Sequence, residues 1–333
     1  MPEQVPLQDP GRYNIAVVIP AYNVEQEIGA VLKSLPRFVR HILVVDDASP
    51  DQTGAILGEA AQADARIEVI THQRNQGVGG AMVSGIRRAL ELGAQIIIKV
   101  DGDGQTPVER LPELLAPLVR GMADMAKGNR FRDFEALGQM PFVRRLGNTA
   151  LSFLVKAATG YWNSFDPTNG YLAVRSDLLQ QMPLERLAPS YFFEISLLGQ
   201  LYLQGAVIHD VAMPARYGAE RSSLSIARVL FEFPPRLVMT LLRRLVLKYA
   251  VYDFSMGSVY LLAGLPLLTF GLIFGSAKWI HFSRLGIPAP TGTVMLATVT
   301  VILGVQLLLS AIGVDLQAVP KDPVCAPLSP VNS

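Results

Sequence analysis

The chain has 333 residues, 50% of them hydrophobic, which is enough for one α/β domain of ordinary size and an appendage. Basic and acidic residues are nearly balanced, at 29 Lys and Arg against 28 Asp and Glu, so the charge indicates no nucleic acid as a partner. The single cysteine, Cys325, excludes an internal disulfide, and the histidines lack the spacing of a zinc site. Residues Met1 to Tyr13 have neither the basic start nor the apolar core of a secretory signal.

Strand-like and helix-like segments alternate along the first part of the chain. Apolar runs at residues 14–19, 41–46, 66–71 and 95–100 alternate with helical patterns at 25–35, 53–62 and 79–92. This alternation predicts βαβ units and a mostly parallel sheet. No Gly-x-Gly-x-x-Gly motif follows the first run, so the pattern does not by itself indicate a dinucleotide fold.

Two of these strands end in acidic residues. The second runs into Asp46-Asp47, and the fourth runs into Asp101-Gly102-Asp103-Gly104-Gln105. Open α/β sheets bind ligands at the carboxyl ends of their strands, and two carboxylates on one turn can hold a divalent cation that also contacts a diphosphate. The alternative for the tripeptide alone is a solvated Asp-Gly turn.

A glycine-rich segment, Asn75 to Ala81, follows the third strand. Gly77 and its neighbours can let the backbone approach a nucleotide at a helix start. A helix-entry turn with unusual dihedral angles is an equally good explanation.

Together with the first strand and its Pro20-Ala21-Tyr22-Asn23 turn, these ordered motifs resemble the family-2, A-type inverting glycosyltransferases over roughly residues 14 to 224. The resemblance implies a GT-A fold, a Rossmann-like α/β domain, with Mg²⁺ or Mn²⁺ held by Asp101 and Asp103 near Gln105. It places the nucleotide sugar against Pro20, Ala21, Tyr22, Glu25, Asp47, Gly77, Asp101, Asp103, Gln105 and Arg221. One departure concerns the ribose contact of Glu25, because relatives often have Glu directly after Tyr-Asn and this chain has Val24 there.

Arginines in the next segment suit a phosphate acceptor. Arg130 follows an apolar stretch, and Thr149 stands four residues after Arg145 on one predicted helical face. As isolated residues these would be ordinary surface side chains. In the polyprenyl-phosphate (dolichyl-phosphate mannose synthase-like) members that the chain resembles, the matching positions bind the lipid phosphate.

Asp166-Pro167-Thr168-Asn169-Gly170 is typical of a turn, and it also resembles the acceptor-side segment of the same enzymes. Many family-2 enzymes place a catalytic base in this region. A phosphate acceptor is already an anion, so we expect Asp103, Arg130 and Asp166 to contribute mainly orientation and charge stabilisation.

Two further motifs bear on the reaction. No Gln-x-x-Arg-Trp follows Tyr191-Phe192-Phe193-Glu194, where processive synthases carry it, so one sugar per encounter is the simpler prediction. Arg221 lies in a segment, Arg216 to Ser223, that resembles a mobile segment closing over the diphosphate. The alternative is a polar linker.

The C-terminal part is suited to a membrane. Met256 to Phe274 and Val294 to Val314 contain no charged residue and have the length of transmembrane helices, with buried core helices as the alternative. Before them, Arg236 to Ala250 has one basic face and an otherwise apolar surface, which predicts an interfacial helix beginning at Pro234-Pro235. Its charges place the head and the tail on the cytoplasmic side, since the loop 278–290 carries few.

The sequence thus predicts four segments: a GT-A domain at 1–224, an amphipathic interfacial helix at 225–252, two transmembrane helices at 253–316 and a disordered tail at 317–333. The predicted activity is metal-dependent, inverting transfer of a hexose from a GDP- or UDP-sugar to undecaprenyl or dolichyl phosphate. A homo-oligomer is compatible with the sequence. The alternatives are transfer to a lipid or glycan hydroxyl, and a non-catalytic membrane partner that binds nucleotide sugar.

Overall fold

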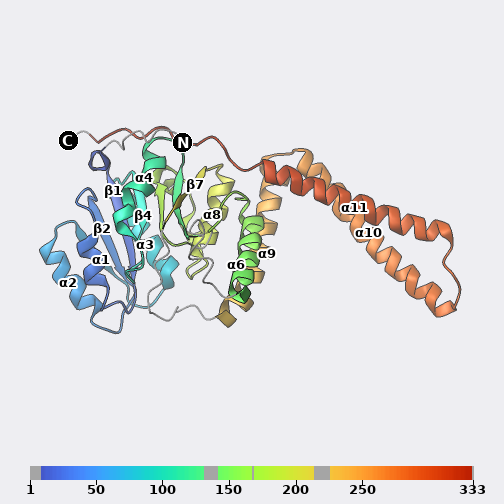
Figure 1. Ribbon diagram of the computed structural model, residues 1–333, viewed down its shortest axis with the longest axis horizontal. Coiled ribbons are helices and arrows are strands. Elements are labelled where there is room, and N and C mark those ends of the chain that lie inside the picture. The colour runs from blue at the N-terminus through green and yellow to red at the C-terminus, as the bar shows by residue number, and fades with distance from the viewer. Residues whose placement is uncertain (1–8, 131–141, 167–168, 214–225, 332–333) are drawn as a thin grey trace. The chain divides into compact units, whose positions relative to one another are not determined.

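The computed structural model describes residues 9–130, 142–166, 169–213 and 226–331, without the side chains of 142–148 and 226–231 (Figure 1). The chain divides into two units. The first comprises Met1–Thr240 with Pro320–Ser333, and the second Leu241–Val319.

A seven-stranded sheet forms the centre of the first unit, in the order β3-β2-β1-β4-β6-β5-β7. Its strands are β1 (Ile15–Ala21), β2 (His41–Asp46), β3 (Ile67–Thr71), β4 (Ile96–Lys99), β5 (Met125–Asn129), β6 (Leu172–Arg175) and β7 (Ile208–Ala212). Only β6 runs antiparallel to its neighbours β4 and β5. The predicted mostly parallel sheet is therefore confirmed, and the strand order reverses between β1 and β4, where open α/β sheets bind their ligands.

Helices cover both faces of this sheet. In chain order the helices of the first unit are α1 (Ile28–Ser34), α2 (Thr53–Ala63), α3 (Gly77–Glu91), α4 (Leu111–Val119), α6 (Phe142–Thr159), α7 (Ser176–Gln180) and α8 (Phe193–Leu203), and α9 (Ile226–Val246) begins in this unit and ends in the second. Short 3₁₀ turns lie at η1 (Pro10–Arg12), η2 (Val108–Arg110) and η4 (Leu184–Arg186). Each of the first three predicted helices is present, and the predicted strands agree with β1 to β4 to within two residues at each end.

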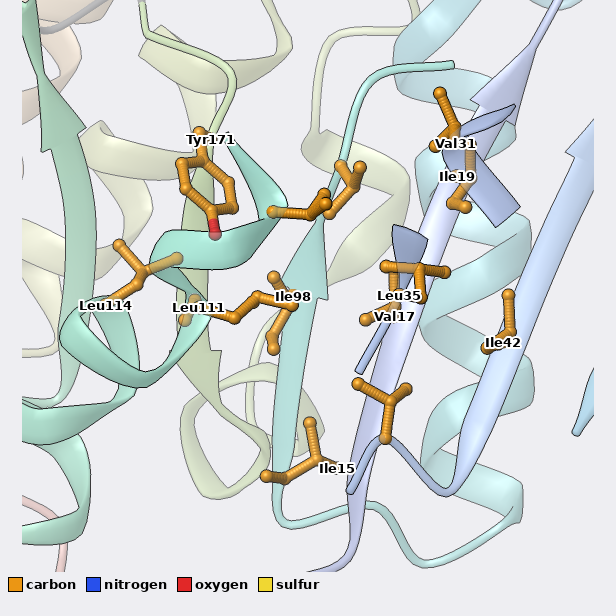
Figure 2. Close-up of a cluster of buried hydrophobic side chains, with 14 of the residues drawn as sticks. Ile15, Val17, Ile19, Val31, Leu35, Ile42, Ile98, Leu111, Leu114 and Tyr171 are labelled. Carbon is orange, nitrogen blue, oxygen red and sulfur yellow. The ribbon is translucent and has the colours of Figure 1, made fainter. Parts of the chain in front are cut away.

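Alternation along the strands determines which face each side chain occupies. Ile15, Val17 and Ile19 of β1 are buried in one cluster with Ile98 of β4 and side chains from α1 and α4 (Figure 2). On the opposite face α3 packs so closely that a Cβ atom at Gly85 would lie 2.2 Å from Val18 Cγ1. A strand buried on both faces explains the continuous apolar runs in the sequence.

The helix α9 begins within the predicted segment 225–252, but its relation to the two prolines differs from the prediction. Pro234 and Pro235 lie inside the helix and do not mark its beginning, which is at Ile226. Phe233 and Leu237 are buried, and the Phe233 ring packs edge-on against Phe192 at 5.4 Å. This packing compensates for the loss of the helical hydrogen bonds that the two prolines cannot donate.

The second unit contains two long helices, α10 (Met256–Leu285) and α11 (Thr291–Gln317), which are long and apolar enough to cross a membrane. They lie side by side (Figure 1), and their contact depends on small residues, since a Cβ atom at Gly304 would lie 2.6 Å from the Leu268 backbone nitrogen. Such close approach through glycine is typical of helices that pack in lipid. Lys278, His281 and Arg284, expected in a loop, lie in the last turns of α10.

The same unit contains a buried ion pair. Arg244 Nη1 lies 2.6 Å from Asp315 Oδ1, and the Tyr249 hydroxyl donates to the same oxygen at 2.8 Å. Tyr249 lies in η5 (Leu247–Tyr252), a π-helical turn that follows α9. Charge-assisted hydrogen bonds therefore connect the end of α9 to the end of α11.

The tail beyond α11 forms an extended segment, where the sequence predicted disorder. Asp124, which is fully buried before β5, accepts hydrogen bonds from the backbone N–H groups of Val324 and Cys325 at 3.0 and 2.8 Å. Farther along, the Val331 N–H donates to the Arg12 carbonyl at 2.8 Å. A proline-rich composition thus did not prevent order, because the first unit supplies partners for the tail's backbone.

Candidate active site

Side-chain hydrogen bonds hold together the loops that follow β1 and β2. The Asn23 and Val24 N–H groups donate to Ser49 Oγ and Thr53 Oγ1 at 3.2 and 3.1 Å. Asn23 adopts a φ of 57°, which asparagine tolerates better than most residues. Three residues of this loop are predicted to contact the nucleotide. Ala21 is buried and Pro20 is partly exposed, whereas Tyr22 is 51% exposed just beyond the carboxyl end of β1.

Glu25 has a partner in the same pair of loops. Its carboxylate accepts a hydrogen bond from the Gln52 N–H at 2.9 Å, and its own N–H donates to Asp51 Oδ2 at 3.2 Å. Gln52 immediately precedes α2, where a carboxylate also compensates the helix dipole. The structure therefore gives Glu25 a role in closing the loops, and its predicted ribose contact is not needed to explain its position.

Asp47 organises the start of α3. Its Oδ1 lies 2.6 Å from His72 Nδ1 and accepts from the Gln76 N–H, while its Oδ2 accepts from the Gly77 N–H at 2.7 Å. His72 Nε2 is in turn 2.9 Å from Ser84 Oγ. Asp47 is 2% exposed, and both of its carboxylate oxygens already have partners within the protein. Its hydrogen bond to a nucleotide base stays a prediction.

The glycines at the start of α3 are explained by a close backbone contact. The Pro189 carbonyl accepts hydrogen bonds from the Gly79 and Gly80 N–H groups, and a Cβ atom at Gly79 would lie 2.0 Å from the Ala188 oxygen. Gly77 has a φ of 81°. Asp47 and Pro189 thus accept hydrogen bonds from the Gly77, Gly79 and Gly80 amides at the start of α3, which favours the helix-entry explanation of this segment.

Asp101 and Asp103 lie on one tight turn at the end of β4, beside the end of β1. A Cβ atom at Gly102 would lie 3.3 Å from the Pro20 oxygen, and Gly104 has a φ of 73°. Asp103 Oδ1 accepts from the Gln105 N–H at 3.0 Å, and the Gln105 side chain is exposed.

This turn can hold a hard divalent cation. Both ligands would be carboxylate oxygens, and Mg²⁺ in substrate sites typically takes one or two carboxylates with the remaining positions filled by water and phosphate. Within the described residues, no group of three or more His, Cys, Asp or Glu side chains has the arrangement of a metal site. Two carboxylates on one turn match the protein ligands of such a cation.

Sequence reasoning missed two residues here, Lys99 and Glu194. The Lys99 ammonium is buried and forms an ion pair with Asp101 Oδ1, and it lies 3.2 Å from Glu194 Oε1 at the start of α8. Burial alone would lower the pKa of Lys99, but the charges of Asp101 and Glu194 raise it above its usual range. The available signal was a lone lysine in the apolar strand that precedes Asp101, because a buried charge requires a partner.

Arg130 and Asp166, which the sequence predicts on the acceptor side, are paired with each other. Arg130 Nε and Nη2 donate to the two carboxylate oxygens of Asp166 at 2.8 and 3.2 Å, and the Arg130 N–H donates to Oδ2. The Asp166 side chain is fully buried, whereas 42% of the Arg130 side chain is exposed. Lys127 anchors the segment from below, since its buried ammonium donates to the Asp166 carbonyl and lies 3.5 Å from Asp210.

The remaining predicted acceptor residues lie on or beyond α6. Thr149 is exposed on this helix, and Arg145 stands one turn before it, although the Arg145 side chain is outside the described residues. Arg221 also lies outside the described residues.

Comparison with known proteins agrees with this geometry. The model of the family "Glycosyl transferase family 2" matches residues 16–182, which include β1 to β4 and the Asp101–Asp103 turn. The chain belongs to glycosyl transferase family 2. It is therefore a glycosyltransferase, and the resemblance found in its sequence is confirmed.

Several curated relatives act on lipid phosphates by name. The chain is 30% identical to a UDP-N-acetylglucosamine–dolichyl-phosphate N-acetylglucosaminyltransferase of Methanococcus voltae, over 53% of this chain and 75% of the relative. It is 32% identical to a polyprenol monophosphomannose synthase of Mycolicibacterium smegmatis, over 59% and 74%. It is also 32% identical to an undecaprenyl-phosphate mannosyltransferase of Micrococcus luteus, over 55% and 75%.

Solved structures share the fold. A glucosyl-3-phosphoglycerate synthase of Mycobacterium tuberculosis, crystallised with Mg²⁺ and uridine diphosphate, superposes with a TM-score of 0.51 at 23% identity, over 70% of this chain and 79% of that one. At this identity the likeness shows the GT-A fold alone.

Proposed function

We propose that this glycosyltransferase moves a hexose from a nucleoside diphosphate sugar to a polyprenyl phosphate at the membrane surface. An oxygen of the acceptor phosphate forms the new bond to the anomeric carbon as the bond to the diphosphate breaks, with inversion. The nucleoside diphosphate then leaves. The activities named for the curated relatives support this acceptor class.

The observation that carries the proposal is the pairing of Asp166 with Arg130. A general base must be able to reach and accept the proton of a hydroxyl acceptor. Asp166 is fully buried, and both of its oxygens accept hydrogen bonds from the Arg130 guanidinium. A carboxylate held in this way is poorly suited to deprotonate a sugar hydroxyl, whereas an acceptor phosphate needs no base.

On the donor side, we assign the nucleoside to the loops after β1 and β2, which include Tyr22 and Asp47, and the diphosphate to the Asp101–Asp103 turn. Asp101, Asp103 and Gln105 would hold Mg²⁺ or Mn²⁺. When bound, the cation would stabilise the charge of the leaving diphosphate. Two carboxylates at the switch point between β1 and β4 support this assignment.

On the acceptor side, we assign the lipid phosphate to Arg130, Arg145 and Thr149. A guanidinium matches the paired oxygens of a phosphate. The partly exposed side chain of Arg130 supports this role, because Asp166 fixes one edge of its guanidinium while part of the side chain faces solvent. Arg221 would contact the diphosphate.

We further propose that α10 and α11 anchor the enzyme as two membrane spans with the catalytic domain, residues 1–224, on the cytoplasmic side. The tail supports this topology. Its residues Val324 and Cys325 bond to Asp124 in the catalytic unit, which supports a chain that returns to the side from which it entered. An even number of crossings is consistent with this return.

A panel of donors and acceptors tests the proposal. Purified full-length protein is incubated with radiolabelled UDP- and GDP-sugars and with undecaprenyl phosphate, dolichyl phosphate, diacylglycerol or a free glycan. We expect label in a lipid product only with the two lipid phosphates. Transfer to diacylglycerol or glycan, with none to lipid phosphate, would identify a hydroxyl acceptor instead. Binding of a donor without transfer to any of these acceptors would overturn the proposed acceptor class.

A further inference from the structure

Three segments meet around the Asp101 carboxylate. Lys99, the last residue of β4, pairs with Asp101 Oδ1 and with Glu194 Oε1 of α8. Gly170, on the loop that enters β6, completes the group, since a Cβ atom there would lie 2.5 Å from Lys99 Nζ and 2.6 Å from Asp101 Oδ2. Oδ1 of the Asp101 carboxylate is thus paired with the Lys99 ammonium, and Oδ2 packs closely against Gly170.

The two charges behind Asp101 are buried. Lys99 is 2% exposed and Glu194 is 9% exposed, whereas 37% of the Asp101 side chain is exposed. An isolated buried charge is costly, so the lysine and the glutamate hold each other in place. Lys99 therefore presents a fixed ammonium to a carboxylate that would otherwise rotate at the surface.

We propose that Lys99 is a positioning residue for Asp101, with Glu194 as its anchor and Gly170 as the wall that limits the carboxylate. This inference rests on the proposed function, in which Asp101 contacts the metal and diphosphate. Partners behind a metal-binding carboxylate orient it, and their loss typically reduces metal affinity or activity by 10- to 100-fold.

The geometry also links the two substrates. Gly170 stands four residues after Asp166, which is paired with Arg130, and Asn169 between them donates to the Gly128 carbonyl at 2.9 Å. Residues close to each other in the chain thus contact the proposed donor-side carboxylate and the proposed acceptor-side arginine.

Gly170→Ala tests positioning without changing the charge of the site. The added methyl group must displace Lys99 or Asp101. Glu194→Gln removes the anchor of Lys99 while preserving its shape, and Glu194→Asp retains the charge. Lys99 itself is the less informative position, because its replacement changes the charge next to the cation.

The experiment measures Mn²⁺ binding to the full-length protein in detergent. The electron paramagnetic resonance signal of free Mn²⁺ reports the binding, once in the presence of UDP and once in the presence of GDP. We expect Gly170→Ala and Glu194→Gln to weaken Mn²⁺ binding by about 10- to 100-fold and to lower kcat, with little change in the KM for lipid phosphate. Glu194→Asp should restore part of the affinity.

Gly199→Ala is the matched control. Gly199 lies on α8 with Glu194, and its Cβ atom would lie 3.3 Å from Thr240 Cγ2, so the variant crowds the same helix without touching Lys99, Asp101 or Gly170. We expect its Mn²⁺ affinity to equal that of the unaltered protein. Thermal melts of all variants identify any that fail to fold.

Asp103→Asn separates the two proposals. If Asp103→Asn abolishes Mn²⁺ binding while Gly170→Ala and Glu194→Gln bind Mn²⁺ normally, the positioning role is wrong and the metal site stands. If Asp103→Asn also binds Mn²⁺ normally, the assigned metal site is itself wrong.

Discussion

Arg130 and Asp166 form a pair in which each residue depends on the other. Removing the guanidinium would leave Asp166 as a buried charge without this partner, which typically costs about 3–5 kcal/mol. A kinetic effect of Arg130→Ala alone would therefore mix a loss of acceptor binding with a loss of stability. The double variant Arg130→Ala/Asp166→Asn removes both charges and separates the two effects.

We predict that Asp166→Asn retains turnover within about tenfold, because an anionic acceptor has no proton for it to remove. Arg145→Ala and the Arg130→Ala/Asp166→Asn double variant should raise the KM for lipid phosphate and leave donor binding nearly unchanged. Steady-state kinetics with thermal melts provide the measurement. Complete loss of activity in Asp166→Asn with an altered pH profile, together with a silent Arg145→Ala, would favour a hydroxyl acceptor.

Metal removal should stop the reaction without unfolding the protein. We predict that excess EDTA abolishes transfer and that Mn²⁺ or Mg²⁺ restores it, because the leaving diphosphate loses several kcal/mol of charge stabilisation without the cation. Asp103→Asn should be inactive under all of these conditions and should melt like the unaltered protein. Full turnover in EDTA would contradict the prediction.

At the residue scale, the sequence predicted the position of side chains that are close to each other in the chain. Asp101 and Asp103 were recognisable because a glycine turn after an apolar strand places both at the sheet edge. The pairing of Lys99 with Glu194 was not, because these residues are far apart in sequence and meet only through the packing of α8 on the sheet. For the same reason the internal partners of Asp47 were not foreseen.

At the scale of elements, hydrophobic periodicity predicted β1 to β4 and the helices between them, because each strand is buried and each helix has one apolar face. The boundary predicted at Pro234-Pro235 is wrong, because both prolines lie inside α9. The contact of Phe233 with Phe192, which stabilises this helix across the prolines, is tertiary and therefore invisible to a local pattern. The tail failed likewise, since its order depends on Asp124.

The tail makes a prediction about Cys325. Burial, with the nearby Asp124 carboxylate, raises the pKa of its thiol to about 12. At pH 8 only about 10⁻⁴ of the thiol would then be thiolate, the reactive form. We predict slow labelling by iodoacetamide in the native protein and fast labelling in urea.

Asp124→Ala should speed the labelling of Cys325 in the native protein, because the variant releases the N–H groups of Val324 and Cys325. Cys325→Ser is the control for specificity, since the chain has only one cysteine. Equal rates in native and urea-treated protein would show that the tail is not held in this way.

At the scale of the whole molecule, we predict that the full-length protein stays with membranes in high salt and leaves them only in detergent. Salt screens the basic residues of an interfacial helix but does not weaken the burial of two apolar spans. Fractionation followed by immunoblotting provides the measurement. Recovery in the salt wash would indicate that α10 and α11 are core helices of a soluble protein.

A head cut after Leu224 should no longer sediment with membranes, but we expect it to melt at a lower temperature than the full chain. The cut removes the buried Phe233 and Leu237 of α9, and it also removes the tail N–H groups that bond to the buried Asp124. The division at Leu224 predicted from composition therefore differs from the compact unit, which continues to Thr240 and includes residues after α11. Composition reports where polarity changes along a chain, whereas the unit depends on contacts between distant segments.

The attachment of the tail to Asp124 also affects the order in which this protein folds during its synthesis. The strands of the sheet leave the ribosome first, and domains generally begin to fold as they emerge. Val324 and Cys325, however, are made only after α10 and α11. Asp124 therefore cannot complete its hydrogen bonds until both long helices have been translated, so the last contacts of the first unit form after the synthesis of α10 and α11.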